Sequence, residues 1–246
     1  MGKVKSIDII DINAFLKREL NSINSFFKND LHSNGYSIGN LEHNNINKLY
    51  ILKVATEYGI LVPETHLILN KNDICVLLEN GEYITKPASD AGFIMLSKSA
   101  VLGGYTHLIS KEEVNNISQN FFPTLVQEKI EKEYELRIFY LKPNFYASAI
   151  LSQNDERTKI DFRNYNKSKP NRTLPYILPN GLKKKLAILL NRFNFNACSI
   201  DMIVNKNGQY YFLEINPVGQ FEFSGYHCNY YLDYVLAKGL ITHENN

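Results

Sequence analysis

The chain has 246 residues, 44% of them hydrophobic, and its 27 lysines and arginines nearly balance its 25 aspartates and glutamates. This length and composition predict a compact globular protein and exclude disorder over most of the chain. The net charge of +2 is too small to indicate a nucleic-acid or membrane-surface partner, so we expect neither. Any anion-binding site must therefore be local.

The three cysteines, Cys75, Cys198 and Cys228, lie far apart and match no metal-ligand spacing, so we expect buried thiols. The sequence does not begin with a basic stretch followed by an apolar core. No run approaches the length of about 20 apolar residues that a membrane span needs. These features favour the cytoplasm, a reducing compartment in which free thiols persist.

The segment 1–46 is predicted to be small and helical. Between Asp11 and Lys28, apolar residues recur at three- and four-residue intervals, which is typical of an amphipathic helix. These residues are Ile12, Phe15, Leu16, Leu20, Ile23, Phe26 and Phe27. Asp11 is the expected N-cap. A polar stretch follows over 29–45, and a second helix is predicted over 47–58, where Gly59 ends it.

From residue 65 the pattern changes to short β-rich runs between turns, which predicts an α+β protein. The expected strands are 65–69, 83–86, 105–109, 124–128, 134–141 and 145–152, with a helix over 72–79. The polar stretch 153–171 predicts a long solvated loop, and such loops are often functional. The last elements expected are a helix from 179 to about 191, a hairpin of strands 199–204 and 210–215, and a helix over 229–238.

Three oxygen-bearing side chains are expected to converge on that last hairpin. Asp201 lies in an otherwise apolar strand, and Glu214 and Asn216 lie two positions apart on the returning strand. Strand side chains alternate faces, so Glu214 and Asn216 point the same way, and pairing about the turn at 207–208 brings Asp201 near Glu214. Hard oxygen ligands of this kind suit Mg²⁺. The alternative is an acidic pair at a solvated strand edge, which the apolar neighbours disfavour.

Weaker signals precede the hairpin. Lys86 ends a short strand before the small-residue loop 88–93, whose backbone amides could face phosphate oxygens, although a lysine before proline is common at strand ends. Glu135 and Arg137 alternate onto one face of a strand that follows the run 127–130. There Glu135 could accept hydrogen bonds from a ribose, or the strand could be a solvated edge. Asp161 and Arg163 share a face if their loop is extended, where they could meet a phosphate or a substrate carboxylate.

Taken in order, these motifs resemble the landmarks of the ATP-grasp superfamily. The residues that carry the resemblance are Lys48, Lys86-Pro87, Gln127-Glu128-Lys129-Ile130, Glu135-Leu136-Arg137, Asp201 and Glu214-Ile215-Asn216-Pro217. The match covers about 47–240. Within the superfamily, the runs 135–137, 152–153, 161–163 and 216–221 are similar to ligases that cyclise ribosomal peptides of the microviridin, or graspetide, type. The likeness is greatest to the ligases of grasp-with-spasm systems.

The resemblance implies an ATP-grasp fold with a small subdomain over 47–123 and a C-terminal subdomain over 124–246, with ATP between them. It also implies roles for single residues. Lys48 and Lys86 would bind the phosphates of the nucleotide, and Glu135 would bind its ribose. The adenine would be bound by Gln127, Glu128, Lys129 and Ile130. The charge of the phosphoryl group would be neutralised by Arg137, Arg163 and Arg172, with Asp161 beside them. The Mg²⁺ ions would be bound by Asp201, Glu214 and Asn216.

The implied reaction is phosphorylation of an Asp or Glu side chain by ATP, after which an amine or hydroxyl displaces phosphate. Its product is an amide or ester crosslink in a ribosomally made precursor peptide. The expected cofactors are ATP and Mg²⁺, and a homodimer is the expected assembly. One alternative is a ligase that adds amino acids to a peptide or protein. Another is a non-catalytic nucleotide-binding partner of a maturation complex, because full-length relatives carry an additional α/β domain before the position of Lys48 and 1–46 would be its remnant.

Overall fold

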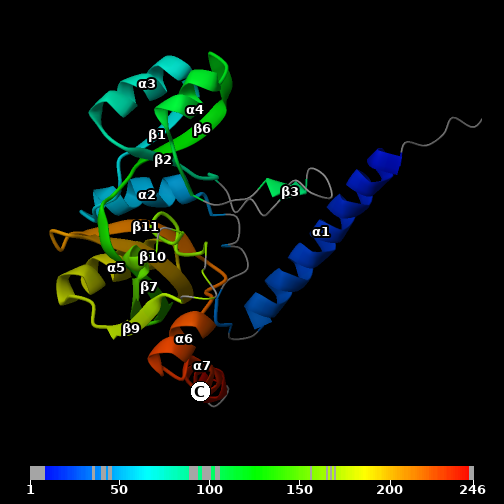
Figure 1. Ribbon diagram of the computed structural model, residues 1–246. Coiled ribbons are helices and arrows are strands. Elements are labelled where there is room, and N and C mark those ends of the chain that lie inside the picture. The colour runs from blue at the N-terminus through cyan, green and yellow to red at the C-terminus, as the bar shows by residue number, and fades with distance from the viewer. Residues whose placement is uncertain are drawn as a thin grey trace, which may run out of the picture.

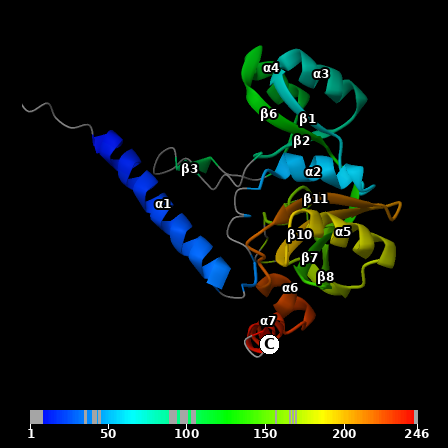
Figure 2. The same cartoon turned by 180° about the vertical axis from the view of Figure 1, so that it is seen from behind.

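The computed structural model describes residues 9–34, 37–39, 43, 46–88, 94–95, 101–102, 106–155, 157–164, 166, 168 and 170–243. Two antiparallel sheets form the body of the molecule, and the long first helix stands away from it in both views (Figures 1 and 2). The α+β class predicted from the sequence is confirmed. No helix in the described part of the chain is long and apolar enough to cross a membrane.

The first two helices are α1 (Ile9–Asn34) and α2 (Lys48–Glu57). α1 begins before Asp11, so the prediction that Asp11 caps this helix is wrong. The apolar period identifies one face of a helix but does not locate its ends. The prediction for α2 is confirmed: the side chain of Asn47 accepts the backbone N–H of Tyr50 at 3.1 Å, and Gly59 follows the helix with φ of 67°.

The small sheet has the strand order β1-β6-β2-β5. Its strands are β1 (Thr65–Asn70), β2 (Tyr83–Thr85), β5 (His107–Leu108) and β6 (Asn120–Glu128). Helices α3 (Lys71–Asn80) and α4 (Lys111–Asn116) join it, and Ile68, Ile74 and Val126 are among its buried core residues. β6 pairs with β1 and β2, so it belongs to this sheet, although the expected boundary at 123–124 assigns it to the other subdomain.

The large sheet has the order β11-β10-β7-β8-β9. Its strands are β7 (Lys132–Leu141), β8 (Asn144–Leu151), β9 (Arg172–Tyr176), β10 (Ala197–Asn205) and β11 (Tyr210–Asn216). A separate pair is formed by β3 (Ile94–Met95) and β4 (Val101–Leu102). The sequence did not predict β9, which follows the polar stretch 153–171.

Helices α2 and α5 (Asn180–Arg192) supply one side of the main core. Ile51 and Leu189 belong to the same buried cluster as Leu136, Ile200 and Met202 of the large sheet. Since strand side chains alternate, the residues between them on β7 and β10 point to the other face. That face is directed toward the small subdomain and carries the charged residues of the candidate site.

The chain ends in two helices, α6 (Glu222–Cys228) and α7 (Leu232–His243), rather than in one helix over 229–238. Asn229 and Tyr231 lie between α6 and α7, and their φ angles of 53° and 48° are in the left-handed region, which separates the two helices. The hydroxyl of Tyr230, between them, donates to the backbone oxygen of Ala147 at 2.6 Å. The predicted terminal helix is therefore confirmed over 232–238, but its predicted start at 229 is wrong, because residues 229 and 231 leave the helical region and Tyr230 packs on β8.

Candidate active site

A row of charged side chains crosses three strands of the large sheet. Asp201 on β10 is the register partner of Glu214 on β11 and of Arg137 on β7. Directly opposite residues of an antiparallel pair point to the same face. The expected convergence of Asp201 and Glu214 is confirmed, and Arg137 joins them from the third strand.

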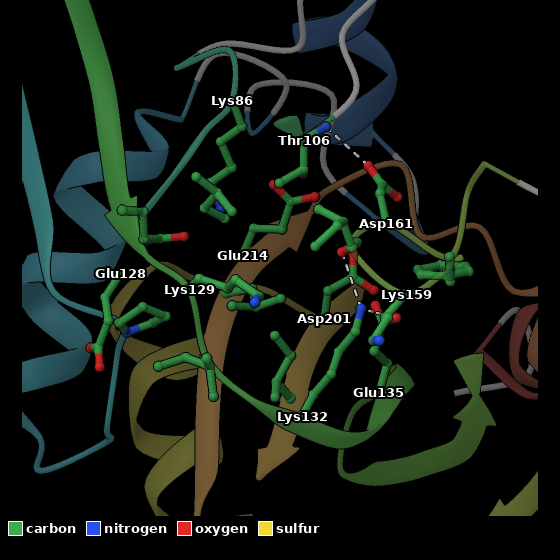
Figure 3. Close-up of a pocket in the computed structure, with 18 of the residues that line it drawn as sticks. Lys86, Thr106, Glu128, Lys129, Lys132, Glu135, Lys159, Asp161, Asp201 and Glu214 are labelled. Atoms are coloured by element: carbon green, nitrogen blue, oxygen red, sulfur yellow. Dashed lines mark hydrogen bonds and ion pairs between the residues drawn. The ribbon is translucent and has the colours of Figure 1, made fainter. Parts of the chain in front are cut away.

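A β-bulge shapes the edge of this row. Asp201 pairs with Glu214 but Met202 pairs with Phe212, so Leu213 is the extra residue on β11. The bulge interrupts the alternation of side chains, and the consecutive residues Leu213 and Glu214 both line the cleft between the two sheets. Figure 3 shows Glu214 and Asp201 on neighbouring strands of this cleft.

The carboxylates of the row are held by direct contacts. One guanidinium nitrogen of Arg137 donates to both oxygens of Asp201, at 2.7 and 2.6 Å. The second donates to Gln220 Oε1 at 3.1 Å. Lys48, the first residue of α2, places its Nζ 3.0 Å from Glu214 Oε2. Helix α2 therefore delivers a positive charge to the end of the row.

Asn216 provides a test of whether these residues fit a metal ion. Its Nδ2 donates to Asp201 Oδ2 at 2.9 Å and to Glu214 Oε1 at 3.3 Å, so a single atom reaches both carboxylates. A cation could occupy a similar bridging position. The orientation of an amide follows from its hydrogen bonds, and rotation would turn Asn216 Oδ1 toward that position. Two carboxylates and an amide oxygen fit Mg²⁺, which takes few protein ligands. The described residues contain no group of three or more His, Cys, Asp or Glu that could hold a metal ion, so this site would depend on two carboxylates and one amide oxygen.

Burial and the neighbouring charges set the protonation of the row. Burial raises the pKa of Asp201, an effect that Arg137 opposes and Glu214 reinforces. Burial acts in the same direction on Glu214, but Lys48 and Lys86 outweigh it, so the pKa of Glu214 lies below its ordinary value. Burial lowers the pKa of Lys86, and Glu214 opposes that shift. The site thus places the cations of Lys48, Lys86 and Arg137 against two carboxylates. Such an arrangement could admit a phosphate chain together with a divalent cation.

Lys86 extends from the end of β2 into the same cleft, opposite Asp201 and Glu214 (Figure 3). The proposed phosphate loop after it lies at 88–93, and residues 89–93 are outside the described part of the chain. The two lysines expected to bind phosphates therefore approach the row from different elements, Lys48 from α2 and Lys86 from the small sheet.

The run 127–130 forms another wall of the cleft. The backbone N–H groups of Glu128 and Lys129 donate to Glu64 O at 2.8 Å and to Glu82 O at 2.9 Å, so neither is available to a ligand. Gln127 is 1% exposed, and its Nε2 donates to Thr65 Oγ1 at 2.8 Å. Within the described residues its Oε1 has no hydrogen-bond partner. A buried acceptor without a donor is costly, so this atom suits a ligand N–H group.

Glu135 lies on the same face of β7 as Arg137, in a buried network. Its Oε1 accepts Lys132 Nζ at 2.6 Å (Figure 3). The same oxygen accepts Ser152 Oγ at 2.8 Å. Burial raises the pKa of Glu135, and Lys132 opposes that shift. Sequence reasoning missed Lys132, because strict alternation places residues three apart on opposite faces. A register shift on β7, where Asn205 pairs with Lys132 and Val204 with Tyr134, brings Lys132 to the cleft.

The loop after β8 closes the cleft on another side. Arg163 Nε and a terminal nitrogen donate to Asp161 at 2.9 and 2.6 Å, and Asp161 Oδ2 also accepts the backbone N–H of Thr106 at 3.2 Å. Asp161 therefore connects this loop to the small subdomain. Arg172, in contrast, begins β9 with an exposed side chain and is not among the described residues that line the cleft.

Several solved structures that resemble this chain are ATP-grasp ligases or macrocyclases of ribosomal peptides. The macrocyclase MdnC of Microcystis aeruginosa MRC, bound to its precursor peptide MdnA, is 30% identical, with a TM-score of 0.70 over 90% of this chain and 69% of that one. A RiPP-associated ATP-grasp ligase of Chryseobacterium gregarium, in complex with ADP and with leader and core peptides, is 26% identical, with a TM-score of 0.73 over 87% of this chain and 64% of that one.

The ATP-grasp ligase PsnB, complexed with a minimal precursor, Mg and ADP, shares the fold at 17% identity, with a TM-score of 0.74 over 96% of this chain and 71% of that one. No protein-family model and no curated protein matches the sequence. The chain belongs to the family of RiPP-associated ATP-grasp ligases, whose substrates are ribosomally synthesised peptides. It spans about two thirds of the length of the MdnC and Chryseobacterium gregarium ligases.

Proposed function

We propose that the protein is an ATP-dependent carboxylate ligase that forms an ester or amide crosslink in a ribosomally made precursor peptide. The single observation that carries the proposal is the charged row of Arg137, Asp201 and Glu214 in the cleft between the two sheets. The family supports it, since a related ligase is bound to ADP and to leader and core peptides. The reaction would convert ATP to ADP and phosphate.

ATP would lie in the cleft with its base at the run 127–130 and its phosphates at Lys48 and Lys86. With the N–H groups of Glu128 and Lys129 already bonded, Ile130 is the member of this run whose backbone N–H could serve the base. Gln127 Oε1, which has no hydrogen-bond partner among the described residues, would accept the exocyclic amino group of adenine. Glu135, fixed by Lys132 and Ser152, would then hold the ribose.

The phosphate end of the nucleotide would meet the charged row. Asp201, Glu214 and Asn216 would hold Mg²⁺, which would supply positive charge to the phosphate oxygens. Arg137 orients Asp201 through two hydrogen bonds, and Arg163, which lines the same cleft, would meet the peptide carboxylate. Phosphorylation of that carboxylate creates a leaving group, so the protein needs only to position the reactants and stabilise charge.

The proposal includes cytoplasmic residence and a homodimer. All three cysteines are free, which suits a reducing compartment. Cys198 and Cys228 are buried as expected, but the expectation is wrong for Cys75, which is exposed. The homodimer is supported by a line of large apolar side chains that α1 leaves exposed.

The test combines the purified chain with ATP, Mg²⁺ and a precursor peptide encoded beside it. The expected result is a loss of one water mass from the peptide per crosslink, together with ADP release. An increase in peptide mass would replace the proposal with a ligase that adds amino acids. Nucleotide binding without ADP release, and with an unchanged peptide, would replace it with a non-catalytic binding partner.

A further inference from the structure

One face of α1 carries a continuous line of exposed apolar side chains, here called the α1 stripe. The α1 stripe consists of Ile12, Leu16, Leu20, Ile23, Phe27 and Leu31, with Phe15 and Phe26 along one flank. These eight side chains are between 40% and 71% exposed. In Figures 1 and 2 the helix projects from the body, so the described part of the molecule does not cover this face.

The area of the α1 stripe matches what a stable protein interface requires. A whole aromatic side chain offers roughly 150–250 Å² and an aliphatic one somewhat less, so eight half-exposed side chains present on the order of 700 Å². Monomeric proteins seldom expose an apolar patch above about 600 Å². A specific complex buries about 800 Å² on each partner. The α1 stripe is therefore large enough to be the centre of an interface.

We infer that the α1 stripe pairs with the α1 stripe of a second copy of this chain, the two helices running antiparallel. The inference gives a surface and an orientation to the proposed homodimer, on which it rests, and it is independent of the ligase reaction. The spacing of the stripe carries it. Leu16, Leu20, Ile23 and Phe27 alternate at intervals of four and three residues, the spacing of a two-helix seam.

The seam is self-complementary in the antiparallel direction. When Leu16 of one copy packs against Phe27 of the other, Leu20 packs against Ile23, and Ile12 reaches Leu31 at the ends. The polar positions of the seam also coincide, because Asn13 then faces Asp30 and the two can hydrogen-bond. A parallel pair in register would instead place Asp30 against Asp30, a like-charge contact that is unfavourable inside a seam.

The charges of α1 favour a protein partner over a membrane surface. The helix carries three cationic residues, Lys17, Arg18 and Lys28, and three anionic ones, Asp11, Glu19 and Asp30. Amphipathic helices that lie on membranes are instead rich in lysine and arginine on their polar face. Because α1 has no net charge, it would not attract anionic lipids. Its association must then depend on the apolar face, which the same face of a second copy can cover.

The first test measures the mass of the full chain in solution by sedimentation velocity. Wild type is expected to be dimeric, and Leu20→Glu with Ile23→Glu is expected to raise the dissociation constant at least 100-fold, giving a monomer with unchanged ATP binding. The matched control is Asn21→Glu with Ser22→Glu, which adds the same charge on the opposite face. A monomeric wild type, or equal effects of the two double variants, would overturn the inference, as would a monomer that floats with phosphatidylserine vesicles.

The second test determines the orientation by disulfide formation. The exposed Cys75 is first removed by Cys75→Ser. Two proteins are then made in this background, one with Leu16→Cys and the other with Phe27→Cys. The antiparallel seam predicts a disulfide when the two proteins are mixed, and none when either is oxidised alone. Cross-linking of each variant with itself would identify a parallel pair and overturn the antiparallel arrangement, whatever the outcome of the ligase assay.

Discussion

Arg137 holds Asp201 from one nitrogen, at 2.7 Å from Oδ1 and 2.6 Å from Oδ2, across the register of β7 and β10. The same carboxylate accepts Asn216 Nδ2 at 2.9 Å. Asp201 is therefore fixed in orientation by groups on two neighbouring strands. A buried carboxylate with both oxygens engaged keeps its position with or without a ligand, which is the preorganisation that charge stabilisation requires.

Asp201→Asn and Glu214→Gln are expected to reduce ADP release by about 100-fold or more, because each removes one anionic oxygen of the proposed Mg²⁺ site. Both replacements keep the shape and a hydrogen-bonding oxygen, so the fold should persist. The initial rate of ADP formation at saturating Mg²⁺ and ATP measures the effect. Chelation of Mg²⁺ should abolish the wild-type rate.

Glu222→Gln is the matched control for these variants, because Glu222 is an exposed acidic residue of α6 outside the cleft. Its rate should stay within about twofold of wild type. Equal rates for the Asp201 and Glu214 variants and for this control would exclude the charged row as the metal site.

Gln127→Leu is expected to remove the preference for the amino group of adenine. Wild type should bind ATP about tenfold more tightly than the triphosphate of purine riboside, which lacks that group, since one hydrogen bond to a buried acceptor contributes about 1–1.5 kcal/mol. In the variant, titration calorimetry should give equal affinities. Gln119→Leu, at an exposed position, serves as the control. A preference that survives in Gln127→Leu would place the adenine elsewhere.

The sequence was sufficient to predict the hairpin that brings Asp201 and Glu214 together, because each step of that inference is local. Asp201 and Glu214 are brought together by a short turn and by alternation along two strands, and both follow directly from residue order. The same holds for α2, which Asn47 and Gly59 delimit chemically. Order along the chain also identified the family, since Lys86, Glu135 and Asp201 occur in the order of its motifs.

Other features could not be predicted, because they depend on contacts between distant segments. The register shifts that turn Leu213 and Lys132 into the cleft follow from pairing with β10, which local composition does not encode. The break between α6 and α7 follows from the bond of Tyr230 to β8. The sequence suggested Asp161 as a partner for Arg163 but could not place Arg172, and only the fold shows that Arg163 lines the cleft and that Arg172 is not among the described residues lining it.

The pH dependence of stability should show the burial of Glu135. Burial raises the pKa of Glu135 in the folded protein above its ordinary value of 4.5. The protonated form of Glu135 therefore contributes its full stabilisation of the fold below pH 4.5, and this contribution is lost as the pH rises through the raised pKa. Wild type should therefore lose unfolding free energy relative to Glu135→Gln between pH 4.5 and neutrality. Lys132→Met should increase this loss, because Lys132 opposes the shift.

Urea denaturation of each protein at pH 4.5 and 7.5 measures that loss. Glu133→Gln is the control, because Glu133 is the exposed neighbour of the same strand. Its stability should follow that of wild type at both pH values. If wild type and Glu135→Gln changed in parallel, Glu135 would ionise at its ordinary pKa and the buried network would not determine its charge.

Arg163 and Arg172 offer the sharpest comparison of sequence with geometry. The family resemblance gives both the same role, but Arg163 lines the cleft beside Asp161 and Arg172 lies exposed at the start of β9. Arg163→Met is expected to lower the rate of ADP formation by about 100-fold, because it removes a positive charge from the cleft in which the phosphoryl transfer is proposed to occur. Arg172→Met should change the rate less than about twofold. Asp161 loses its ion-pair partner in Arg163→Met but keeps the backbone N–H of Thr106. Arg163→Lys, which keeps the charge without the planar fork, separates charge from folding and should recover part of the rate. A large effect of Arg172→Met would mean that β9 moves toward the cleft when substrate binds.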